Sequence, residues 1–159
     1  MTLEQEIHQE SFTSDQSKLI VNIIYTYNVL KGRIMEELKE HGLTMQQYNV
    51  LRIVKGSGSE GVTTSEIRER MLDKMSDASR MVDRLMAMGL LEKVRFKEDR
   101  RLFYIHLTAL GDELITSLVT NSLVEDIASM VPIKSAEQLN TLLDAFRSSM
   151  QMSTNSSDN

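Results

Sequence analysis

The sequence predicts a mostly helical protein with one small β-hairpin. Apolar residues recur at three- and four-residue steps over most of the chain, which is the period of a helix face. The 159 residues include one Pro and seven Gly, so few positions break a helix. After Gly89 the pattern changes to alternation of apolar and polar residues, which is typical of strands.

Composition excludes several classes of protein. The chain is 41% hydrophobic and 26% charged, which is the balance of a globular domain. It has no Cys, so disulfides, thiol catalysis and thiolate metal sites are excluded. His8, His41 and His106 are not at ligand spacing, and we expect neither a metal nor a cofactor. There is no apolar run of about 18 residues and no signal-peptide pattern at the N-terminus, so we expect no membrane partner and a cytoplasmic location.

Start and stop signals divide the helical part of the chain. Residues 1–14 are polar and predict an N-terminal arm, and a long helix from Asp15 to His41 ends at Gly42. Three shorter helices follow, and their N-cap signals are the capping boxes Thr44–Gln47 and Thr63–Glu66, and Ser76, which is expected to cap a helix that stops at Gly89.

A hairpin and two closing helices complete the predicted order. The hairpin contains Val94 and Phe96 in one strand and Phe103, Ile105 and Leu107 in the other, with a polar tip at residues 97–100. Thr108 caps a helix that Pro132 breaks, and Ser135 with Gln138 opens the last helix. Residues 151–159 are low in complexity and are expected to be disordered.

Three helices followed by a hairpin form the winged version of the helix-turn-helix, here at residues 43–108. The flanking helical regions, 15–42 and 109–150, are predicted to form a homodimer, because the first helix has more apolar surface than a monomer of 159 residues could easily cover.

The predicted helix Ser76–Met88 has an apolar side and a side suited to DNA. The apolar side holds Ala78, Met81, Val82, Leu85 and Met88, and the other holds Ser76, Ser79, Arg80, Asp83, Arg84 and Ala87. Short hydroxyl side chains allow close approach, and Arg can bond bidentately to a guanine edge. The helix N-terminus favours phosphate.

The charge distribution also favours DNA binding by this part of the chain. The chain carries a net charge of −5, yet the segment from Lys74 to Arg101 has eight basic and five acidic residues. An Arg at the hairpin tip can enter a narrow minor groove, where Asp99 would orient it. The candidate DNA-contacting residues are Lys74, Ser76, Ser79, Arg80, Arg84, Lys93, Arg95, Lys97, Arg100 and Arg101.

Four pieces of sequence occur in an order that resembles the MarR family of bacterial transcriptional regulators. They are Leu43-Thr44, VTTSEI at residues 62–67, SDASRMVDRLMAMGLLEK at residues 76–93, and Asp99-Arg100-Arg101 followed by Leu107-Thr108 and Gly111. The resemblance covers roughly residues 15–150 and implies a homodimer with entwined terminal helices. It places helix 76–88 in the major groove and a wing at residues 97–101, with Arg101 as the family's wing Arg and Asp99 as the acid two positions before it.

The resemblance also implies an effector pocket between the dimerisation helices and the DNA-binding domain. The family's effectors are often small aromatic or lipophilic acids. Tyr25 and Tyr48 are candidate lining residues, although such Tyr side chains more often lie in a core or an interface.

We therefore expect a regulator, usually a repressor, that binds a pseudopalindromic operator on double-stranded DNA. The alternative is a winged-helix module for protein interaction that lacks specific DNA binding. No catalytic motif supports an enzyme.

Overall fold

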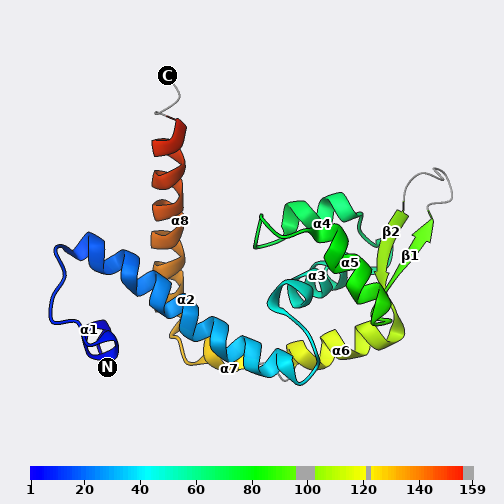
Figure 1. Cartoon of the computed structure of the whole chain (residues 1–159), viewed down its shortest axis with the longest axis horizontal. Coiled ribbons are helices and arrows are strands. Elements are labelled where there is room, and N and C mark those ends of the chain that lie inside the picture. The colour runs from blue at the N-terminus through cyan, green and yellow to red at the C-terminus, as the bar shows by residue number, and fades with distance from the viewer. Residues whose placement is uncertain (96–102, 121–122, 156–159) are drawn as a thin grey trace. The chain divides into compact units, whose positions relative to one another are not determined.

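The computed structural model describes the chain except residues 96–102, 121–122 and 156–159. It contains two compact units, Met1–Asn121 and Ser122–Asn159. The described elements are α1 (Leu3–Ile7), α2 (Asp15–Lys39), α3 (Met45–Lys55), the 3-10 turn η1 (Gly58–Glu60), α4 (Thr64–Arg70), α5 (Ala78–Ala87), β1 (Leu91–Arg95), β2 (Phe103–Leu107), α6 (Ala109–Thr120), α7 (Leu123–Ser129) and α8 (Ile133–Asn155) (Figure 1). The mostly helical fold with a small hairpin is confirmed.

The core of the first unit lies between α3, α4, α5, α6 and the hairpin. Leu51, Ile67, Leu85, Ile105 and Ile115, one from each of these five parts, are fully buried. They are the apolar residues of amphipathic segments whose polar residues stay in water, and removing their apolar surface from water stabilises the fold.

The two strands pair antiparallel, with Leu91 opposite Leu107 and Arg95 opposite Phe103. Val62, just before α4, extends this ladder by exchanging two backbone hydrogen bonds with Ile105, at 3.1 and 2.8 Å. The middle of β2 is therefore fixed to the segment just before α4.

Both predicted capping boxes are present. The backbone N–H of Gln47 donates to the Thr44 hydroxyl at 3.2 Å, and the Gln47 amide oxygen accepts from the Thr44 N–H at 2.8 Å. In the second box the Thr63 N–H donates to the Glu66 carboxylate at 2.8 Å, and the Glu66 N–H donates to the Thr63 hydroxyl at 3.3 Å. Each box satisfies N–H groups that a helix start leaves without partners.

The cap of α5 is Asp77, so the prediction of Ser76 as the N-cap is wrong. The Asp77 carboxylate accepts from the backbone N–H of Arg80 at 3.2 Å, and the Ser76 hydroxyl instead donates to Asp73 at 2.8 Å. Both residue types are good caps, and the bond of Ser76 to Asp73 leaves Asp77 to cap the helix. At the other end Gly89 has φ +73°, as predicted for a helix stop.

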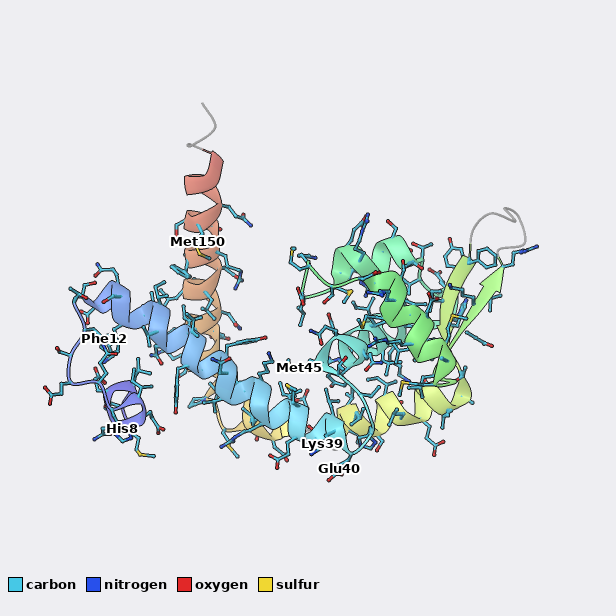
Figure 2. The ribbon with its side chains drawn as sticks, in the orientation of Figure 1. His8, Phe12, Lys39, Glu40, Met45 and Met150 are labelled. Atoms are coloured by element: carbon cyan, nitrogen blue, oxygen red, sulfur yellow. The ribbon has the colours of Figure 1, made fainter. Side chains whose placement is uncertain are left out.

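The chain between α2 and α3 turns through Gly42, which has φ +65°. Figure 2 shows Lys39 and Glu40 at the end of α2 and Met45 at the start of α3. The predicted stop at Gly42 is thus in place, because a left-handed conformation suits Gly.

The N-terminal segment contains more structure than the predicted arm. Residues 3–7 form α1, Leu3 is buried, and the Tyr25 hydroxyl on α2 donates to Glu6 at 2.9 Å. Lys18 on α2 forms an ion pair with Glu4 at 2.5 Å.

The helices after the hairpin also differ from the prediction. The Thr108 hydroxyl caps α6 by accepting from the Gly111 N–H at 3.0 Å, as expected. The helix predicted from there to Pro132 covers α6 and α7, and its continuity between Thr120 and Leu123 lies outside the described residues. Ser135 does not open α8, because the backbone N–H groups of Ser135 and Ala136 donate to Pro132 at 2.9 and 3.0 Å. Pro suits a helix start because it lacks an N–H, and α8 continues to Asn155, beyond residue 150.

The long helix α2 buries little of its apolar side within the chain. Leu38 is its only fully buried residue, whereas Leu19, Ile20, Ile24, Tyr27, Val29, Leu30 and Met35 are exposed. In α8, Leu139, Leu142 and Leu143 are exposed too.

Among the described residues no single helix is both long and apolar enough to cross a membrane. The required length and composition are met only when two segments are counted together, Ala109–Ser129 and Ile133–Gln151.

Candidate nucleic-acid interface

Residues at the starts of α4 and α5 line an open hollow of about 470 Å³. On the α4 side it is lined by Thr64, Ser65 and Arg68, and on the α5 side by Ser76, Asp77, Ala78 and Ser79. Two helix starts with short hydroxyl side chains therefore face one space, together with one guanidinium group.

The exposed side of α5 continues from this hollow. Ala78, Val82 and Leu85 are buried, so the opposite side of the helix presents Ser79, Arg80, Asp83, Arg84 and Ala87 to solvent, as predicted. Met86 packs against the core, while Met88, which was predicted on the apolar side, is exposed.

Arg80 and Arg84 carry the free positive charge of α5. Among the described residues, neither guanidinium group has a hydrogen-bond acceptor or an ion-pair partner, and both are exposed. A guanidinium group has five N–H donors, so these two side chains can bond to an external acceptor without giving up an internal one.

The turn before α5 is ordered by Asp73. Its carboxylate accepts from the Ser76 hydroxyl at 2.8 Å and from the Met75 N–H at 3.0 Å. These bonds stabilise the charged form and hold the pKa of Asp73 below its ordinary value, with the Ser76 hydroxyl as the larger cause. Ser76 is therefore a half-buried part of the turn rather than a free donor.

Three other predicted basic residues already have contacts within the chain. Lys74 donates to the backbone carbonyl of Glu69. Lys93 pairs with Asp83 at 3.3 Å, and the Arg95 guanidinium lies 5.4 Å from the centre of the Phe103 ring. All three side chains are exposed, and surface contacts of this kind are weak enough to exchange for phosphate.

The predicted wing tip lies outside the described residues. It comprises Lys97, Asp99, Arg100 and Arg101, so the roles assigned to them from the sequence stay predictions. The described ends of both strands, at Arg95 and Phe103, are exposed.

Thr64, Ser65 and Arg68 were missed by the sequence analysis. All three lie within the first five residues of α4, and they line the hollow with the start of α5. Their signal in the sequence is the stretch after Thr63, where two short hydroxyl side chains precede a basic residue one helix turn later.

Tyr25 and Tyr48 have separate surroundings. Tyr25 donates to Glu6, whereas Tyr48 packs against the core and lies below the guanidinium of Arg52 at 5.9 Å. A hollow of about 450 Å³ between α3 and α6 is lined by neither. The effector pocket stays a prediction. The described part of the chain also contains no cluster of three or more His, Asp or Glu side chains that could hold a metal ion.

Residues 33–118, which contain the hollow, α5 and both strands, match the family model described as transcriptional regulator SarA/Rot. The chain belongs to this family. Members are regulators of transcription rather than enzymes.

A curated relative is a regulator of transcription as well. The chain is 34% identical over 86 residues to the transcriptional repressor MdtR of Bacillus subtilis. The match spans 54% of this chain and 54% of MdtR, so it covers about half the length of that relative.

Two solved structures show the same fold. The S. aureus MepR–DNA complex has a TM-score of 0.67 at 19% identity, covering 87% of this chain and 99% of MepR. A mutant MarR from E. coli in complex with operator DNA has a TM-score of 0.64 at 23% identity, covering 86% and 99%. The predicted MarR-type winged helix is therefore confirmed.

Proposed function

We propose that this SarA/Rot family member is a homodimeric repressor that binds a pseudopalindromic operator. The observation that carries the proposal is the exposed side of α5, where Arg80 and Arg84 have no acceptor among the described residues and short side chains allow close approach. A helix fits the major groove of B-form DNA, and a guanidinium group matches the acceptors of guanine.

The first turns of α4 and α5 add the backbone contacts. The hollow lined by Ser65, Arg68 and Ser79 offers hydroxyl and guanidinium donors beside two helix N-termini. Phosphate is stabilised by both kinds of donor. We assign Arg80 and Ser79 to base edges, and Arg68, Lys74, Arg84, Lys93 and Arg95 to phosphates.

The wing completes the footprint in this proposal. Lys97, Arg100 and Arg101 follow β1, and Arg101 would enter the minor groove with Asp99 orienting it. Basic residues on either side of α5 would then neutralise phosphates along one face of the duplex.

The dimer follows from uncovered apolar surface. The exposed apolar residues of α2 and α8 give a second copy a surface to bury. Twofold symmetry would repeat α5 about one helical turn of DNA away. MdtR, the relative that matches half of this chain, is named a repressor, which supports repression over activation.

An effector would act by population shift. The dimer would exist in two forms, one with a spacing of its two α5 helices that fits DNA and one with a spacing that does not. A small aromatic or lipophilic acid that binds the second form more tightly would lower operator affinity, and the size of the effect would equal the difference between its affinities for the two forms. Acting on DNA also agrees with the cytoplasmic location expected from the sequence.

The test begins with selection of duplexes from random DNA by the full wild-type chain. Against the selected duplex, we expect Arg80→Ala and Arg101→Ala each to lose about tenfold in affinity, because each removes a donor to a base or a groove. The matched control is Arg33→Ala, an exposed Arg on α2, which should bind like the wild type.

Salt provides a second readout. Affinity should fall steeply as salt rises, because phosphate contacts release counterions. Equal affinity of all three variants, or binding insensitive to salt, would contradict the proposal. Binding without sequence preference would favour the protein-interaction module instead.

A further inference from the structure

The turn between α4 and α5 exposes two large apolar side chains next to the candidate interface. Leu72 is 86% exposed and Met75 is 94% exposed. The turn itself is short and polar, with Asp73 and Lys74 between these two residues. Apolar side chains exposed to this degree gain free energy when a partner covers them.

This turn is held in one conformation by the chain around it. The Asn49 side chain accepts from the Leu72 N–H at 2.9 Å, and Asp73 accepts from the Met75 N–H and the Ser76 hydroxyl. An ordered turn presents its side chains at fixed positions, so binding through them costs little backbone entropy.

Met75 is the nearer of the two in sequence to the residues of the proposed DNA surface. It directly precedes Ser76 and Asp77, which line the hollow with α4. Leu72 directly follows the buried Met71, which ends α4. Met75 is therefore an exposed apolar side chain that directly precedes the polar residues at the start of α5.

We propose that Met75 contacts the 5-methyl group of a thymine in each half-site and so determines part of the sequence preference. The inference rests on the proposed function. The thymine methyl is the one apolar group that the major groove presents, and an unbranched thioether side chain adapts to it. Covering one methyl group corresponds to a change of about fourfold in affinity.

The experiment exchanges the methyl group and the side chain in turn. The full chain is titrated with its selected duplex and with duplexes in which each thymine of one half-site is replaced by deoxyuracil, which lacks only the methyl group. For the wild type, one replacement should weaken binding about fourfold. For Met75→Ala the same replacement should change affinity less than about 1.5-fold, because the contact is already lost.

Two control variants sharpen the result. Met130→Ala removes a Met that is 74% exposed but lies outside the winged helix, and it should keep the fourfold thymine dependence. Leu72→Ala should keep it as well. Since Met75 is almost fully exposed, Met75→Ala should unfold at the wild-type temperature.

Each other outcome overturns the proposal. One such outcome is that no thymine methyl group affects binding by the wild type. The other is that Met75→Ala retains the thymine dependence, so that it loses affinity equally for thymine and deoxyuracil duplexes. Failure of the wild type to bind any duplex is a different result, because it overturns the proposed function itself.

Discussion

Gly111 shows how one backbone position fixes the hairpin to α6. A Cβ at this residue would lie 2.0 Å from the carbonyl oxygen of Leu90, and that oxygen accepts from the Thr108 N–H at 3.1 Å. Leu90 is also held by a bond from its N–H to the Leu85 carbonyl. The contact is between two backbones, so no side-chain rotation relieves it.

We therefore expect Gly111→Ala to lower the free energy of unfolding by at least about 1–3 kcal/mol, the usual cost of overpacking. Urea unfolding followed by circular dichroism measures this change. The matched control is Gly56→Ala, where the nearest atom is 3.4 Å from the added Cβ. Similar stability of the two variants would contradict the packing assigned to Gly111.

The second capping box contains a carboxyl group, that of Glu66, whose protonation makes the free energy of unfolding depend on pH. The Thr63 hydroxyl, and then the Thr63 backbone N–H, hold the pKa of Glu66 below its ordinary value of 4.5. A carboxyl group with a lowered pKa in the folded state stabilises the fold above the unfolded value, and this stabilisation is lost as pH falls through the folded value.

As pH falls from about 5 to about 3, we expect the free energy of unfolding to decrease less for Glu66→Gln than for the wild type. Gln47 already performs the same capping role without titrating, so the substitution preserves the bond pattern. The midpoint of urea unfolding measured across this pH range tests the prediction. Identical pH profiles would show that Glu66 is not the titrating group.

At the scale of the element, hydrogen bonds at its two ends determine where α5 begins and where it stops. Asp77 caps its start, and Gly89 stops it, where the Leu90 N–H donates to Leu85 at 2.9 Å and the Gly89 N–H to Met86 at 2.9 Å. This arrangement satisfies carbonyl groups that the helix end leaves free. The length of α5 therefore depends on these two ends, whereas its exposed side follows from helical period.

Asp77→Ala should destabilise the chain by about 0.5–2 kcal/mol, because the Arg80 N–H loses its acceptor, whereas Asp77→Asn should retain most of the stability. Thermal unfolding of the two variants compares them directly. A greater loss from Asp77→Asn than from Asp77→Ala would exclude the capping role.

At the scale of the whole molecule, the uncovered side of α2 predicts self-association. Ile24 is 55% exposed, and the neighbouring apolar positions of the helix are exposed with it. We expect Ile24→Lys to shift a dimer toward monomer in analytical ultracentrifugation at micromolar concentration, because a buried unpaired charge is costly. Asn22→Lys, on the opposite side of the same helix, should leave the dimer intact. A monomeric wild type would contradict the dimer.

Local signals in the sequence determined most of the elements. The capping boxes at Thr44 and Thr63, the stop at Gly89 and the alternation around Ile105 each depend on residues a few positions apart, so one sequence suffices to find them. The side of α5 that carries Arg80 and Arg84 follows from helical period for the same reason.

Only the tertiary structure decided the rest. In the fold Asp77 rather than Ser76 caps α5, and Arg68 of α4 lies beside the start of α5. Residues 3–7 form a helix that a hydrogen bond between Glu6 and Tyr25 joins to α2. These outcomes depend on bonds and packing between separate elements. A short helix is unstable alone, and two adjacent cap residues are nearly equivalent alone, so the surrounding fold supplies the deciding free energy.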